Sequence, residues 1–126
     1  MKMGNRAIVL FTSNTEGDIS PAVYLHWHGS NVKAWLRDAA LTMRIGSTDY
    51  ASARFCGYCA SKIEGGLSLG LFAPPANLLP ETLKSFSHGD AGVFVVNVDT
   101  GIVSNHFGMA CEGGGGRPFK IALGRF

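Results

Sequence analysis

The stretch Val23-Tyr24-Leu25-His26-Trp27-His28-Gly29, together with residues 31–45 that follow it, decides the fold that we expect for this chain. Apolar and polar side chains alternate up to His28, as in a β-strand that has one face in the core and the other free for further contacts. After a tight turn, the apolar residues of 31–45 recur at helical spacing. The pattern predicts a strand that leads directly into an amphipathic helix, with Trp27 and Trp35 both in the core between them.

The other apolar runs predict five more strands and one more helix. Ser30 or Asn31 is expected to cap the first helix. A second helix is expected over 50–63, capped within Ser47-Thr48-Asp49, while 81–86 forms at most a short helix. The remaining strands are expected over the ranges 6–12, 67–72, 93–98, 102–107 and 118–123. The order β-β-α-α-β-β-β-β predicts an α+β fold, with a mainly antiparallel sheet of about five to six strands and two helices packed on one face.

The composition indicates one compact domain. The chain has 126 residues, of which 46% are hydrophobic and 16% charged. We therefore expect residues 1–126 to form a single domain that contains a flexible glycine-rich loop over 108–117. No apolar run approaches the roughly 20 residues that span a bilayer, so no membrane partner is expected. Three cysteines without an export signal indicate reduced thiols and a cytoplasmic location.

The charge and the surface bear on the partners. A net charge of +2 argues against nucleic acid, because general attraction to its backbone needs several phosphate contacts from a concentrated basic patch. A surface of low charge and a β-rich C-terminal half leave strand edges that another subunit commonly covers. We therefore expect a homodimer or a larger homo-oligomer.

Several short motifs resemble parts of known metal-binding, redox or phosphate-binding sites, but none of these motifs is complete. His26 and His28 have a spacing that can share a metal, but further ligands would have to come from His88, His106 or a cysteine, so we expect no metal and no cofactor. Cys56-x-x-Cys59 falls within a helix, which favours buried structural cysteines. The glycines of 113–116 lack the P-loop pattern. No nucleophile elbow, paired acid motif or HExxH helix is present, so the sequence names no catalytic residue.

The strongest candidate for a binding site combines one strand face with one arginine. Tyr24, His26 and His28 are expected to project from the same face of the strand, and Arg54 is a cation among small residues of the second helix. If the helix packs beside the strand, an anionic purine-like ligand could stack on the tyrosine and bind the guanidinium through its phosphate. The alternative is that Arg54 pairs with Glu64, Asp49 or a backbone carbonyl.

Some segments resemble a family of small phage-encoded proteins. The matching segments are Met3-Gly4-Asn5-Arg6-Ala7-Ile8-Val9, Val23–Gly29, Ala53-Arg54 and Gly65–Gly70. Members of this family open with M-G-N-R-A and carry a Y-L-H-W-N-G element. The resemblance covers about Met3 to Leu71, with Asp90–Val96 also similar. This chain departs from the family at His28, where the family has asparagine, and in the glycine-rich extension after Phe107.

The resemblance implies a phage protein that acts in the cytoplasm of the bacterial host. Small phage accessory proteins without an enzymatic motif often act by binding. The function expected is therefore non-enzymatic: the protein counters a host defence, either by sequestering a small anionic nucleotide-type signal or by blocking a host effector protein. The alternative is a small metal-assisted or nucleotide-cleaving enzyme that uses His26 and His28.

Overall fold

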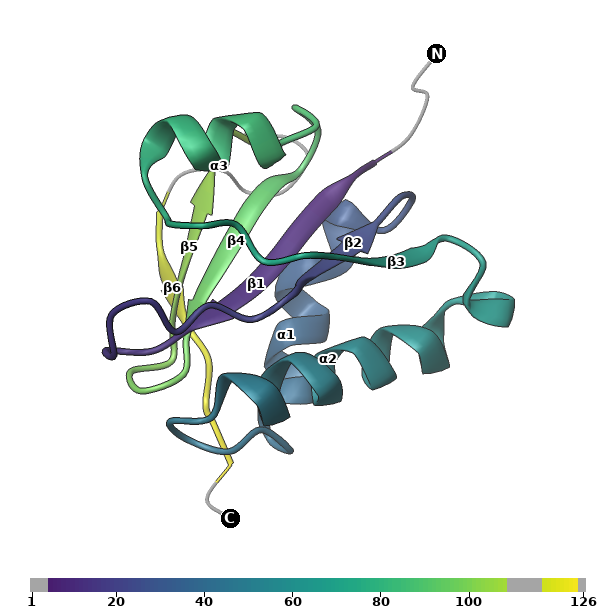
Figure 1. Cartoon of the computed structure of the whole chain (residues 1–126). Helices are drawn as coiled ribbons and strands as arrows, with labels where there is room; N and C mark the ends of the chain where they lie inside the picture. The colour runs from purple at the N-terminus through teal and green to yellow at the C-terminus, as the bar shows by residue number, and fades with distance from the viewer. Residues whose placement is uncertain (1–4, 109–116, 125–126) are drawn as a thin grey trace.

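A computed structural model describes residues 5–108 and 117–124 (Figure 1). The described chain forms a six-stranded sheet with three α-helices and two short 3-10 helices. Its elements are β1 (Ala7–Thr12), β2 (Ala22–Leu25), η1 (Gly29–Asn31), α1 (Val32–Ala40), α2 (Thr48–Lys62), η2 (Glu64–Gly66), β3 (Leu69–Phe72), α3 (Pro80–Phe86), β4 (Gly92–Asn97), β5 (Ile102–His106) and β6 (Phe119–Lys120). Within the described residues, no helix is both long and apolar enough to cross a membrane. The glycines of 113–116 lie outside the described residues.

The strands follow the order β3-β2-β1-β4-β5-β6 across the sheet. The central pair, β1 and β4, is parallel, and the other four pairings are antiparallel. The α+β class and the expected six strands are confirmed, but the sheet is mixed. The long connection through α1, α2, β3 and α3 returns the chain to the starting end of β1, which is the geometry that a parallel neighbour requires. A third, short helix, α3, spans Pro80–Phe86, where at most a short helix was expected over 81–86.

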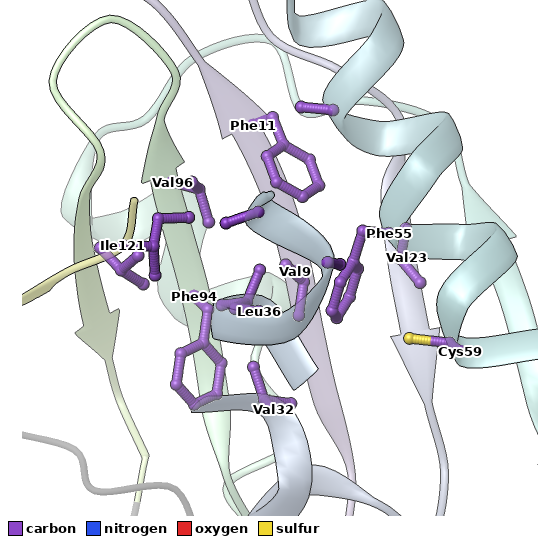
Figure 2. Close-up of a cluster of buried hydrophobic side chains, with 14 of the residues drawn as sticks. Val9, Phe11, Val23, Val32, Leu36, Phe55, Cys59, Phe94, Val96 and Ile121 are labelled. Carbon is purple, nitrogen blue, oxygen red and sulfur yellow. The ribbon is translucent and has the colours of Figure 1, made fainter. Parts of the chain in front are cut away.

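Two clusters of buried side chains lie on opposite faces of the sheet. Val9 and Phe11 alternate along β1 with Ile8 and Leu10, so the two pairs point to opposite sides. The first pair packs in the larger cluster with buried residues of α1 and α2, including Phe55 (Figure 2). The second pair packs in a smaller cluster that contains Leu83 of α3, Ala22, Val93 and Val95. The larger cluster is therefore the main core.

Strand β2 ends at Leu25, three residues earlier than the alternation predicts. The chain then bends, and Gly29 closes the bend by donating its backbone N–H to the Asn5 carbonyl at 2.7 Å. The prediction for Trp27 is consequently wrong: its side chain is 54% exposed. Trp35 is partly buried against the larger cluster. The strand pattern failed here because a bend removes the period-2 register on which it depends.

The helix boundaries also differ from those expected. Helix α1 ends at Ala40 instead of near residue 45, and Asn31, at its N-cap, makes no side-chain cap. The prediction of a cap before α2 is correct, because the Ser47 hydroxyl accepts a hydrogen bond from the Tyr50 N–H. The capped start fixes α2 beneath the sheet, where its buried residues join the main core.

Candidate functional site

Five ring side chains form a continuous line from the bend after β2 to the turn before β4. We call this line the aromatic strip, and it consists of Trp27, His26, Tyr24, Phe72 and His88. The Tyr24 ring is stacked on Phe72, with centroids 5.1 Å apart and planes inclined by 15°. The His88 ring meets Tyr24 edge-on at 5.2 Å, and His26 meets Trp27 edge-on at 4.4 Å. All five rings are at least partly exposed.

The pairing of β2 with β3 places the centre of the strip. Tyr24 lies opposite Gly70 in the antiparallel register. The tyrosine ring lies beside Gly70, and a Cβ built there would be 3.7 Å from the ring, an ordinary van der Waals contact. Phe72, the diagonal neighbour on the same face, then stacks on the ring. Tyr24 belongs to the smaller buried cluster, on the sheet face that also packs against α3.

A short hydrogen bond joins two members of the strip. The Tyr24 hydroxyl lies 2.6 Å from His26 Nδ1. Burial raises the pKa of Tyr24, which outweighs the lowering by the Arg6 charge, so the phenol keeps its proton at neutral pH. It can then donate to Nδ1, and in a neutral imidazole the ring proton is left on Nε2. In that tautomer, His26 presents an Nε2–H donor beside Trp27.

An ion pair lies next to the Tyr24 and His88 rings. Arg6 Nε donates to Asp90 Oδ2 at 2.7 Å, and Arg6 Nη2 donates to the His88 carbonyl at 3.2 Å. The hydrogen bond to Asp90 raises the pKa of Arg6. Burial, followed by the Arg6 charge, lowers the pKa of His88. His88 is therefore a neutral ring at pH 7, suited to stacking and to hydrogen bonding.

Two hollows lie along the strip. The first has a volume of about 310 Å³ and is lined by Tyr24, His26, Trp27 and residues 67–70. The second has about 510 Å³ and its described lining is Lys84, Ser87, His88, Gly89, Phe107 and Gly108. Both volumes fall within the range of small-molecule sites, about 300–1,000 Å³. His88, which contacts Tyr24, connects the second hollow to the strip.

The predicted site residues do not all converge. Tyr24 and His26 are together in the strip, whereas His28 stacks on Trp35 at 5.3 Å. The buried Nδ1 of His28 has no hydrogen-bond partner among the described residues. After β2 ends, consecutive side chains no longer alternate between two faces, so the expected row of three is broken. The prediction that these side chains share one strand face is therefore wrong.

Arg54 lies on the other side of the sheet from Tyr24. Helix α2 packs its buried residues in the cluster that contains Val23, the neighbour of Tyr24 on the opposite strand face. The Arg54 guanidinium lies over the Tyr50 ring, 5.9 Å from its centroid. Within the described part of the chain it forms no ion pair with Glu64 or Asp49. The convergence of Arg54 with the strand residues is thus contradicted, while its role in ligand binding stays a prediction.

The sequence interpretation missed Phe72 and the exposed position of Trp27, and it considered His88 only as a possible metal ligand. Phe72 could have been found from the alternation of residues 67–72, but its contact with Tyr24 depends on the β2–β3 register. His88 lies in a turn after α3 and carried no local signal. Its place beside Tyr24 follows from the way α3 returns the chain to the sheet.

The cysteines and the histidines give little support to reactive or metal chemistry. Burial raises the pKa of Cys59 to about 12 and also raises the pKa of the half-buried Cys56 thiol. Both thiols are therefore protonated at neutral pH and poor nucleophiles. Within residues 5–108 and 117–124, no three histidine, cysteine or acidic side chains are grouped closely enough to hold a metal ion.

Strand β3 bears on the expected association of subunits. It is one of the two edge strands of the described sheet, and residues 65–80, which include it, carry no charge. Leu67 is 92% exposed and Leu71 is 62% exposed. Uncharged edges of this kind favour pairing with another strand. A homodimer or larger assembly stays a prediction, and light scattering that shows a monomer at tens of micromolar would contradict it.

Comparison with known proteins adds no further assignment: no family model, no curated protein and no solved structure matches the chain. The strip offers exposed rings for stacking, an imidazole that is hydrogen-bonded to Tyr24, and the nearby Arg6 guanidinium. These groups suit the recognition of a planar molecule that carries polar or anionic substituents.

Proposed function

We propose that the protein is a non-enzymatic binding protein that holds a small anionic nucleotide-type ligand along the aromatic strip. In keeping with the phage resemblance, it counters a host defence by sequestering this ligand in the cytoplasm of the bacterial host. The observation that carries the proposal is the exposed Trp27 ring at the edge of a 310 Å³ hollow. An exposed tryptophan beside an apolar hollow is typical of a surface that binds a partner.

The first hollow suits the base of such a ligand. Trp27 offers a free ring face, and stacking of a base on an aromatic side chain is worth about 1–3 kcal/mol. His26 and Ser68 line the hollow, where their polar groups can bind the polar edge of the base. The apolar remainder of the lining, with Leu67 and Leu69, excludes water from the stacked ring.

The second hollow suits the phosphate portion. The exposed Lys84 lines it together with His88. The Arg6 side chain is 36% exposed, and its Nη1 donates to no described residue. Arg6 and Lys84 can therefore contribute positive charge near the His88 end of the strip while a base occupies the Trp27 end.

The alternative is the enzyme that uses His26 and His28 for metal-assisted or nucleotide cleavage. The geometry favours binding, because His26 is engaged by Tyr24 whereas His28 stacks on Trp35. A pair of imidazoles turned to different partners is poorly placed to act on one reacting atom. Blocking of a host effector protein is the second form of binding, and the exposed apolar residues around Trp27 would then contact that protein.

One experiment separates these functions. The protein is incubated with a panel of linear and cyclic nucleotides, freed of unbound ligand and denatured, and the released material is identified by chromatography. Release of an intact nucleotide supports sequestration, release of a cleaved product supports the enzyme, and no retention of any nucleotide contradicts the proposal and favours the host effector. Trp27→Ala should lose the ligand, Trp27→Phe should retain part of the binding, and Leu41→Ala, an exposed apolar residue elsewhere, should bind normally.

A further inference from the structure

Two arginine side chains lie over one exposed tyrosine ring near the start of α2. The guanidinium carbon of Arg44 is 4.2 Å from the centroid of the Tyr50 ring, and that of Arg54 is 5.9 Å from it. Arg44 lies in the segment between α1 and α2, where its backbone bridges to Gly124. Arg54 lies one helical turn after Tyr50. The fold therefore brings together two guanidiniums that are ten residues apart in the sequence.

The two positive charges have no acidic partner in the described part of the chain. The single ion pair found there joins Arg6 to Asp90, on the other face of the sheet. Asp49 is adjacent to Tyr50 in the sequence and exposed, but it forms no ion pair with Arg44 or Arg54. Like charges close together repel each other, and the shared ring offsets only part of this repulsion. The site therefore keeps an excess of positive charge.

The other contacts between cations and rings on this side of the protein do not combine two guanidiniums with a tyrosine hydroxyl that donates to no other group. Lys33 and Arg37 both lie over Phe119, which has no hydroxyl group. Lys62 lies over Tyr58, whose hydroxyl already donates to Asp38 at 2.7 Å. Among the described residues, only Tyr50 carries two guanidiniums over its ring and a hydroxyl that donates to no other group. Planar guanidinium groups can each bind an oxyanion through two parallel hydrogen bonds, which a lysine cannot do.

We propose that Arg44, Arg54 and Tyr50 form a binding site for a phosphate or pyrophosphate group of a small molecule. Each guanidinium binds phosphate oxygens, and the tyrosine hydroxyl donates to an oxygen at the rim. The two positive charges match the charge of a phosphate dianion. The start of α2 lies beside the site and adds a weak field of the same sign. This site does not depend on the proposed function, because it lies on the sheet face opposite the aromatic strip.

The test is a titration of the full chain with inorganic pyrophosphate at constant ionic strength, followed by backbone amide shifts in NMR spectra. In the wild type, saturable shifts are expected around residues 44, 50 and 54. Arg54→Ala and Arg44→Ala should each weaken binding by about ten-fold or more, since each removes a charge-assisted contact. Arg54→Lys should weaken it less, because the charge is kept while the planar fork is lost. Lys62→Ala is the matched control and should bind as the wild type does.

Several outcomes would overturn the site. It is excluded if Arg54→Ala binds pyrophosphate as tightly as the wild type, or if Lys62→Ala weakens binding equally, which would indicate general attraction to a basic surface. Shifts that centre on the aromatic strip would place the anion there instead. Both arginines are exposed, so their substitutions are expected to leave the fold intact. If the Arg54 variant nevertheless unfolds, Arg44→Ala and Tyr50→Phe decide the question by the same titration.

Discussion

The two faces of the sheet differ in how they use their side chains. On the face that meets α1 and α2, twenty described residues form the main buried cluster, whereas six form the cluster on the face that meets α3. The smaller cluster leaves the rings of the aromatic strip partly exposed. Stability is thus concentrated on one face, and the other has ring surface available for a ligand. Sites commonly occupy such a position, where a rigid core supports groups that are not themselves buried.

The two faces also differ in whether their arginines are paired with acidic side chains. Near the strip, Arg6 is paired with Asp90. On the face that meets α1 and α2, Arg44 and Arg54 lie over the Tyr50 ring. Neither arginine has an acidic partner among the described residues. The comparison indicates that a nearly neutral chain can still present a local excess of positive charge. The following predictions test the contrast in stability, beginning with the largest expected effect.

Phe55→Ala should destabilise the protein most. Phe55 is fully buried and meets Phe11 edge-on at 5.9 Å, which joins α2 to β1. Its truncation should lower the free energy of unfolding by about 3–5 kcal/mol. Leu83→Ala, on the α3 face, should cost only about 2 kcal/mol because a smaller cluster surrounds it. Urea unfolding of both variants checks the contrast, and equal losses would show that the faces contribute alike.

Gly29→Ala should disturb the bend that supports the strip. A Cβ at residue 29 would lie 2.5 Å from the Ala91 Cβ and 2.7 Å from the Asn5 carbonyl oxygen. We expect a loss of about 1–3 kcal/mol, because overpacked sites force the backbone to shift. The matched control is Gly57→Ala in α2, where no atom lies within 4 Å of the added Cβ. That variant should gain about 0.5–1 kcal/mol from helix propensity, as measured by thermal unfolding.

The two tryptophans should separate stability from binding. Trp35 packs against the main cluster, so Trp35→Ala should lower the free energy of unfolding by about 1–2 kcal/mol. Trp27 is 54% exposed, and Trp27→Ala should change it by no more than about 0.5 kcal/mol. Denaturant unfolding gives both values. A large loss for Trp27→Ala would mean that its ring is covered in solution, as it would be at a subunit contact.

Acidification should cause the smallest change. Burial lowers the pKa of His88 and of His106 below the ordinary value of 6.5. The unfolded chain then binds more protons than the folded one below pH 6.5, so the stabilisation is present above this pH and is lost as the pH falls through the folded pKa values. The thermal midpoint should fall slightly between pH 7 and pH 5, and less in His88→Gln. A midpoint that rises on acidification would contradict the assigned direction.

The sequence by itself determined the elements whose patterns are local. The apolar runs over 93–98 and 102–107 are sufficient to predict strands β4 and β5, which the structure confirms. Ser47 before a helical run predicts the start of α2, because capping involves only residues within one turn. Tyr24 and His26 could be selected as neighbours because they lie on or just beyond one short strand.

The tertiary structure alone decided where the strand ends and which distant groups meet. The bend after Leu25 depends on Gly29 fitting against Asn5 and Ala91, a contact between segments far apart in the sequence. In the bent segment, the Trp27 side chain is exposed and the His28 ring stacks on Trp35. The parallel pairing of β1 with β4 likewise depends on the whole connection between them. Period-2 alternation describes a strand only while the backbone stays extended, so a packing contact that bends the chain overrules it.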